Sequence, residues 1–135
     1  MNQINKKLEV NYRSLVILRI MLSLIFIVAS LSHLLKTEKT VSRLEQAHFG
    51  FIGSFFGPPQ ILVILSGVIM LIAGLFLLFG YKTSWAAIVL IAVLIPITLT
   101  VQVGQMTTVG PLFKNVAILG GLLFFSLNPN LKFKK

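Results

Sequence analysis

The sequence predicts an all-α integral membrane four-helix bundle, with a short interfacial amphipathic helix between the first and second spans. The chain is 56% hydrophobic and 11% charged, whereas a soluble domain carries about 25% charged residues. Four apolar stretches fill most of its 135 residues, at 14–35, 61–80, 84–103 and 109–127. At about 1.5 Å per residue, twenty helical residues cross about 30 Å, the thickness of a bilayer's hydrocarbon core. We therefore expect residues 1–135 to form a single membrane domain.

The basic residues lie at the edges of the predicted spans and indicate an orientation. An even number of spans places both termini on one side, together with Lys6, Lys7, Arg13, Lys82, Lys132, Lys134 and Lys135. The other side receives Lys36, Lys39, Arg43 and Lys114. This excess favours cytoplasmic termini. The net charge of +9 is thereby assigned to lipid headgroups, and nucleic acid is rejected as a partner.

The first span, residues 14–35, is expected to stay in the mature protein as an anchor. Its apolar run is longer than the core of a signal peptide, and no small-x-small cleavage site follows it. Five of its residues fall near one line of the helix, and we call them the polar seam: Arg19, Ser23, Phe26, Ser30 and His33. Ionisable groups in a span normally face the bundle interior or a wet cavity. Alternatively, Arg19 extends to the nearby headgroups.

The connection 36–60 is predicted to contain the interfacial helix. Ser42 and Glu45 match a capping box, which would start a helix at Ser42. An apolar stripe at helical spacing follows it: Leu44, Ala47, His48, Phe51, Ile52 and Phe55. Its phenylalanines would enter the membrane interface, and Gly57, Pro58 and Pro59 would end the helix.

The remaining spans carry signals for turns, bends and close packing. A tight turn at 80–83 makes the second and third spans antiparallel neighbours, with Tyr81 and Trp85 as interfacial anchors. Pro96 is expected to bend the third span, because proline has no backbone N–H. Small residues indicate helix contacts, and they form two pairs: Gly67 with Gly74, and Ala117 with Gly121.

Polar residues of three spans are predicted to reach the same depth at the non-cytoplasmic end. They are His33, Gln102, Lys114 and Asn115, beneath the phenylalanine-rich interfacial helix. Thr98, Thr100 and Gln105 lie near them in the sequence. Donors and acceptors under an aromatic cover form a candidate pocket for a quinone ring or a lipid headgroup. The alternative is that these groups cap helix ends and join neighbouring spans by hydrogen bonds.

Composition excludes several other chemistries. Without cysteine the chain forms no thiolate metal site, no redox dithiol and no covalent haem link, so no covalently bound cofactor is expected. Two histidines, His33 and His48, do not suit a paired-histidine haem, and no metal site is predicted. No acidic residue lies in a predicted span, which argues against a carboxylate proton relay.

Several segments, in order, resemble the DoxX family of small four-helix membrane proteins. They are Leu18-Arg19-Ile20 through Ser32-His33-Leu34-Leu35-Lys36, residues 67–87, Ile95-Pro96-Ile97-Thr98, and residues 112–121, which begin Leu-Phe-Lys-Asn. The resemblance implies a multi-pass protein of a bacterial cytoplasmic membrane or an equivalent energy-transducing membrane. Relatives include subunits of thiosulfate:quinone oxidoreductases and members or assembly factors of membrane redox complexes.

The resemblance thus implies other membrane-protein subunits as partners. This chain departs from the family pattern at two positions that bear on function. Relatives often carry a glutamate where this chain has Met70, and a histidine where it has Gln102. Since both changes remove ionisable groups, we expect a non-catalytic subunit or assembly partner of a larger complex. One alternative is a quinone-interacting oxidoreductase subunit. The other is a small transporter or lipid-binding protein that uses the polar seam.

Overall fold

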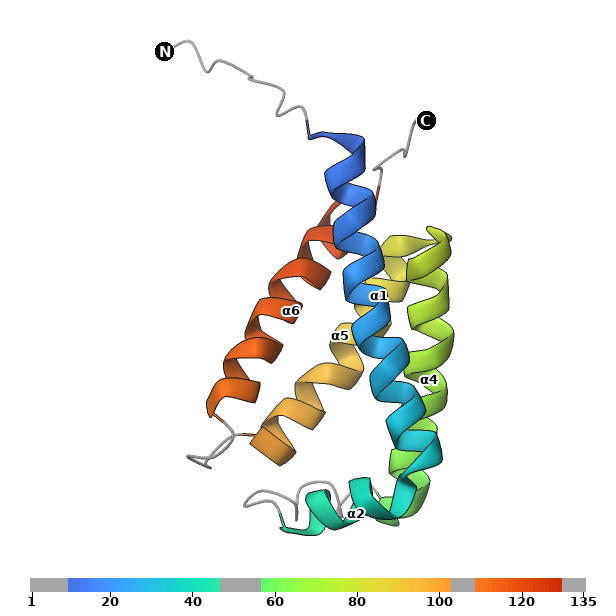
Figure 1. Ribbon diagram of the computed structural model, residues 1–135, viewed down its shortest axis with the longest axis vertical. Helices are drawn as coiled ribbons and strands as arrows, with labels where there is room; N and C mark the ends of the chain where they lie inside the picture. The colour runs from blue at the N-terminus through green and yellow to red at the C-terminus, as the bar shows by residue number, and fades with distance from the viewer. Residues whose placement is uncertain (1–9, 47–56, 103–108, 130–135) are drawn as a thin grey trace.

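The computed structural model describes residues 10–46, 57–102 and 109–129. In this part of the chain the helices are α1 (Tyr12–Leu35), α2 (Thr37–Gln46), α4 (Pro59–Phe79), α5 (Thr83–Ile97) and α6 (Val109–Leu127), and a π-helical turn, η1 (Thr98–Gln102), continues α5 (Figure 1). Four segments are long and apolar enough to cross a membrane: Tyr12–Leu35, Gln60–Phe79, Thr83–Thr100 and Val109–Leu127. The prediction of an all-helical protein with four spans and a short helix between the first two is confirmed.

The burial pattern of the spans is the one expected where lipid is the solvent. Only 22% to 39% of the most apolar stretch of each span is buried inside the protein. Large apolar side chains such as Val28, Ile61 and Phe113 therefore point outward. In water such a surface would be an aggregation hazard, whereas in a bilayer it contacts acyl chains.

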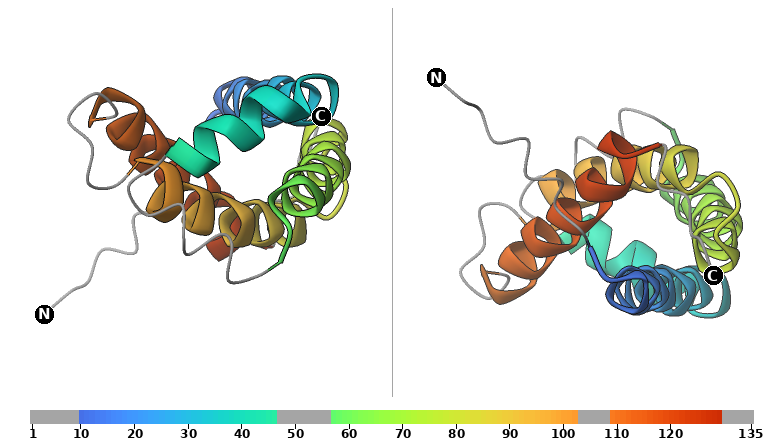
Figure 2. Two further views of the ribbon diagram at one scale, coloured as in Figure 1. Left: turned by 90° about the horizontal axis from the view of Figure 1, so that it is seen from below. Right: turned by 90° about the horizontal axis from the view of Figure 1, so that it is seen from above.

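The four spans follow one another around the bundle. α1 packs along α4, α4 on α5, and α5 on α6 (Figures 1 and 2). α1 begins and α6 ends at the same end of the bundle, as an even number of spans requires. Toward the opposite end α6 diverges from α1, and α2 lies across that end (Figure 1). We call the first end the closed end and the second the α2 end.

Glycines allow α1 to approach its neighbours closely. A Cβ on Gly67 of α4 would lie 3.0 Å from the Cβ of His33, and one on Gly74 would lie 3.3 Å from Ile27. Both glycines of the first predicted pair therefore face α1. In α6 a Cβ on Gly121 would meet Leu22 of α1 at 3.0 Å.

The second predicted pair is only half correct. Ala117 lies one turn before Gly121, so both residues are on the same side of α6. However, Ala117 is exposed. α6 diverges from α1 toward the α2 end (Figure 1), and the buried residues of α6 are Asn115, Ile118, Leu122 and Phe125.

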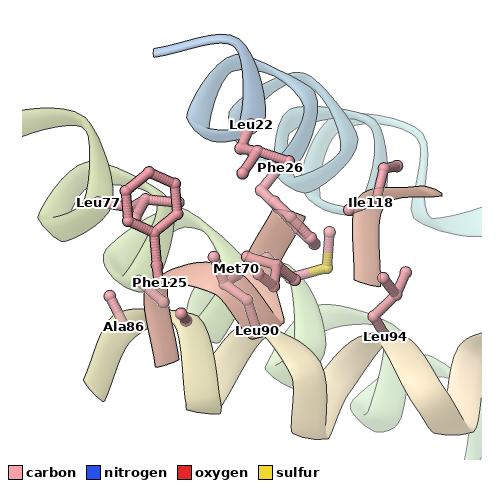
Figure 3. Packing of buried hydrophobic residues seen from close by; sticks show 12 residues of the cluster. Leu22, Phe26, Met70, Leu77, Ala86, Leu90, Leu94, Ile118 and Phe125 are labelled. Carbon is pink, nitrogen blue, oxygen red and sulfur yellow. The ribbon is translucent and has the colours of Figure 1, made fainter. Parts of the chain in front are cut away.

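The hydrophobic core lies where the four spans converge. Figure 3 shows Leu22 and Phe26 of α1, Met70 and Leu77 of α4, and residues of α5 and α6 gathered around one centre. The side chains buried most completely include Leu77, Leu90, Leu122 and Phe125. Met70 is 4% exposed and packs in this cluster.

The start of the short helix differs from the sequence prediction. α2 begins at Thr37, five residues before the expected cap at Ser42. Thr37 directly follows Lys36, which ends α1, and its hydroxyl donates to the carbonyl of His33 at 2.8 Å. Ser42 lies inside α2 and accepts a hydrogen bond from Gln46 at 3.3 Å, so it caps no helix start. The rest of the predicted apolar stripe, 47–56, lies outside the described residues.

The predicted turn after the second span is present, and a change of helix type follows Pro96 in the third. Gly80 ends α4 with φ of 76°, and Tyr81 donates its N–H to the carbonyl of Phe76 at 2.9 Å, so the chain reverses at once. Tyr81 and Trp85 are exposed beside this turn, as the prediction of interfacial anchors requires. In α5 the helix changes from α to π at Thr98, two residues after Pro96.

Candidate functional site

A cavity of about 600 Å³ lies at the α2 end of the bundle, among α1, α4, α5 and α6. α2 forms one of its walls through Thr40, Arg43 and Leu44. Most of the lining is apolar and includes Ile25, Ala29, Met70 and Ile118. The polar and charged lining residues are Ser32, His33, Thr40, Arg43, Ser66, Thr100, Lys114 and Asn115. This size and mixture are typical of small-molecule sites.

The structure brings together three of the four residues singled out from the sequence. His33 from α1 and Lys114 with Asn115 from α6 line this one cavity. Gln102 lies in η1, and its side chain is not among those described, like all of Gln105. The predicted aromatic cover, which includes Phe51, also falls outside the described residues. A ligand role for these residues stays a prediction.

His33 is oriented by a hydrogen-bond chain to α4. Its Nδ1 lies 3.0 Å from the Ser66 hydroxyl oxygen, and that hydroxyl donates to the carbonyl of Val63 at 2.9 Å. Because a serine hydroxyl has one proton, a Ser66 that donates to Val63 accepts from His33, and this arrangement corresponds to the neutral tautomer with its hydrogen on Nδ1. Nε2 is then a hydrogen-bond acceptor on a half-buried side chain beside the cavity.

Asn115 belongs to a second buried chain that joins α6 to α5. Its amide donates to the Thr98 hydroxyl at 2.9 Å, and that hydroxyl donates to the carbonyl of Leu94 at 2.7 Å. Asn115 and Thr98 are 4% and 7% exposed. Asn115 thus joins neighbouring spans, as the alternative interpretation of these polar residues requires, and also lines the cavity.

The polar seam faces the bundle interior, but its hydroxyls are used locally. Ser23 and Ser30 are fully buried and donate to the carbonyls of Arg19 at 2.6 Å and Ile27 at 2.7 Å. Phe26, in the hydrophobic core, separates the two serines. The seam is therefore interrupted by an aromatic side chain and does not form a continuous polar path through the bundle.

Arg19 lies at the closed end, far from the cavity lining. Its guanidinium is against Gly80, and a Cβ added to that glycine would collide with Nη1. Gly80 is the residue that ends α4, where the helix dipole is negative. Arg19 thus contacts the end of a neighbouring helix, and its side chain is half-buried.

The polar lining residues that the sequence did not single out include Ser66 and Arg43, whose sequence signals were weak or misread. Ser66 is an isolated hydroxyl in an apolar span. Its position near the same end of the second span as His33 occupies in the first could have indicated that the two side chains meet. Arg43 was interpreted only as a headgroup contact and as part of the wrong capping box. One face of α2 carries Thr40, Arg43 and Leu44 toward the cavity, at spacings of three and four residues.

Among the residues in the three described ranges, no group of three or more His, Cys, Asp or Glu side chains is placed to hold a metal ion. The candidate site is therefore defined by its cavity and its hydrogen-bonding groups. Lys114 and Arg43 offer hydrogen-bond donors and His33 offers an acceptor, and the rest of the lining is mainly apolar.

Comparison with known proteins supports one assignment. A sequence model of the DoxX family matches residues 14–103, about two-thirds of the 135-residue chain. The match covers α1, α2, α4, α5 and η1 but ends before α6, which carries Lys114 and Asn115. No curated protein and no solved structure matches the chain. Since the match includes three of the four membrane spans and the connections between them, this chain belongs to the DoxX family.

Proposed function

We propose that this DoxX-family protein is a non-catalytic subunit of a larger membrane complex, and that its cavity holds the polar end of an amphipathic membrane molecule. The observation that carries the proposal is the cavity itself. It combines a mainly apolar lining with hydrogen-bonding groups at one end of the spans. An amphipathic ligand presents these two kinds of surface together.

The subunit role rests on what the chain's own residues supply. The sequence has no cysteine, and its three acidic residues, Glu9, Glu38 and Glu45, lie outside the spans. The chain therefore supplies no thiolate for electron transfer and no carboxylate within a span for proton transfer. We infer that any electron transfer to or from a bound molecule involves groups that another subunit brings.

Extraction of the tagged full-length protein from native membranes in a mild detergent tests the subunit role. We expect stoichiometric recovery of at least one other membrane protein, and an organic extract of that complex should contain one amphipathic molecule. Substitution of Asn115 by leucine should reduce the amount of that molecule, whereas Ser84→Ala, at the closed end, should not. Recovery of the protein alone, without a bound molecule, would contradict the proposal.

A quinone ring is a second candidate ligand, favoured by the arrangement around His33. The ring's Nε2 accepts a hydrogen bond, as a quinol hydroxyl requires, while Lys114 donates, as a quinone carbonyl requires. Quinone content of the purified complex, compared between wild type and His33→Ala, tests this assignment. Equal content in the two would exclude His33 as a ring contact.

We propose a cytoplasmic location for both termini. The shared end of the first and last spans and the excess of basic residues at that end support it. Fusion of reporter proteins to the C-terminus and to the α4–α5 turn should give cytoplasmic activity at both places. A periplasmic or extracellular signal at either would reverse the orientation.

A further inference from the structure

We infer that the ligand of this cavity carries an acidic head group, a phosphate or a carboxylate, and that its hydrocarbon chain extends into the lipid between α1 and α6. The inference rests on the proposed binding role and specifies the chemical class of the ligand. It is carried by two cations on the cavity wall and by the separation of two spans on one side of it.

The cations come from different elements. Arg43 of α2 and Lys114 of α6 line the cavity, and neither Glu38 nor Glu45 of α2 does. Within the part of the chain that the structure describes, no acidic residue is on the cavity wall, and Arg43 and Lys114 form no ion pair. A cavity with two positive charges and no negative one favours an anion, and hydrogen bonds from Arg and Lys to oxyanions are about twice as strong as neutral ones.

Both cations line the same cavity as neutral donors. Thr40 follows the same face of α2 as Arg43, and Asn115 is the neighbour of Lys114. An ionised phosphate or carboxylate has several acceptor oxygens, so it needs hydrogen-bond donors from the protein and no acceptor. A neutral ring needs one or two donors and gains nothing from a second full charge.

The side of the cavity between α1 and α6 is open to the bilayer. Near the closed end the two helices are in contact, because a Cβ on Gly121 would meet Leu22 at 3.0 Å. Toward the cavity α6 diverges from α1 (Figure 1), and Ala117, one turn from Gly121, is exposed. On α1, Ile25 and Ser32 both line the cavity and are exposed, which places the edge of the opening between them.

The apolar lining and the volume of the cavity suit a hydrocarbon chain. Ile25, Ala29 and Ile118 line it on the α1 and α6 sides and present only apolar atoms. About 600 Å³ is the size of a small-molecule pocket and holds a head group with part of one chain. The remainder of the chain would lie in the opening and in the surrounding lipid.

The charge is tested by retention of defined lipids in the purified full-length protein. We would exchange the protein into a neutral detergent, add dioleoyl phosphatidate, dioleoyl phosphatidylcholine, oleate or a neutral quinone, and count bound molecules by native mass spectrometry. Wild type should retain phosphatidate and oleate at least about tenfold better than phosphatidylcholine, a difference of about 1.4 kcal/mol. Arg43→Gln combined with Lys114→Gln should abolish that preference.

A matched control removes two charges from the same end of the protein without touching the cavity. Lys36 and Lys39 are exposed and do not line it, so Lys36→Gln with Lys39→Gln should leave the preference unchanged. Equal loss in both double variants would show that headgroup attraction to the whole surface is responsible, and would overturn the inference.

The path of the chain is tested on α1. Ala29→Trp fills the cavity side of the helix and should lower retention of phosphatidate and oleate several-fold, whereas Val28→Trp, on the neighbouring lipid-facing side, should not. Thermal unfolding of each variant verifies that it is folded. Inorganic phosphate that displaces phosphatidate at equal concentration would identify a soluble anion as the ligand and overturn the chain path.

The outcomes separate this inference from the binding role. Retention of a neutral quinone that is insensitive to Arg43→Gln with Lys114→Gln but sensitive to Ala29→Trp would refute the acidic head group and leave the binding role intact. Failure to retain any of the four molecules, in wild type and variants alike, would count against both.

Discussion

Replacement of Gly80 by alanine should destabilise the protein more than its position in a turn suggests. Gly80 has φ of 76°, a left-handed conformation that costs an L-residue about 1–2 kcal/mol. The new Cβ would also collide with Nη1 of Arg19, so the guanidinium must shift at the negative end of α4, which costs up to about 0.3–1 kcal/mol. We therefore expect Gly80→Ala to lower the free energy of unfolding by about 2 kcal/mol.

The two contributions separate in a double-mutant cycle with Arg19→Ala. In the Arg19→Ala background no guanidinium opposes the new methyl group, so only the backbone strain should remain, and the cost should fall by about 0.3–1 kcal/mol. Fluorescence of Trp85, the single tryptophan, follows unfolding in mixed micelles of increasing SDS fraction. Gly120→Ala is the control, because a Cβ there meets nothing within 4 Å. Additive effects of the two substitutions would refute the proposed contact.

Three further outcomes follow from packing and hydrogen bonding. Gly67→Ala should cost about 1–3 kcal/mol of stability in the same SDS assay, because its Cβ would lie 3.0 Å from the Cβ of His33, which cannot rotate away. Asn115→Leu should cost about 1–3 kcal/mol, because Thr98 would lose its donor in a buried site; an unchanged midpoint would show that the bond contributes nothing. Ser66→Ala should release the ring of His33 without unfolding the bundle, seen as a mixture of tautomers in the ¹⁵N shifts of the imidazole, where a single retained Nδ1–H form would refute the Ser66 contact.

The spans were predictable from sequence because hydrocarbon length and backbone hydrogen bonding leave few alternatives. A segment of about twenty apolar residues in lipid satisfies its backbone only as a helix. The turn at Gly80 was also predictable, since a glycine after an apolar helix is a common way to end it. The contacts of Gly67 and Gly74 with α1 followed from the need for small residues where two helices approach in lipid.

Features that depend on tertiary placement were not predictable in the same way. The capping-box pattern at Ser42 is local, whereas α2 begins at Thr37 because the end of α1 supplies a carbonyl acceptor there. Ala117 has the right spacing for packing, but the structure leaves it exposed, outside the buried face of α6 that Asn115, Ile118 and Leu122 form. The spacing of apolar residues along a helix does not determine the angle between two spans.

The candidate site shows the same division. His33, Lys114 and Asn115 were predicted from the sequence to lie together, because each is at the same end of its span. All three line the cavity. Depth alone does not say which side of each helix faces inward. Arg43 and Ser66 needed the rotation of α2 and α4 about their axes, which only packing determines.

The two ends of the bundle are built differently, and this asymmetry makes the proposals testable. At the closed end Leu77 and Phe125 are fully buried, and Ser84 donates to the carbonyl of Ser126, which joins α5 to α6 at 3.0 Å. At the α2 end, α1 and α6 are apart, and a cavity borders the core residues Phe26, Met70 and Ile118. Substitutions at the closed end should therefore alter stability with little effect on ligand retention. Substitutions of the cavity cations should do the reverse, because Arg43 and Lys114 are exposed and lie outside the hydrophobic core.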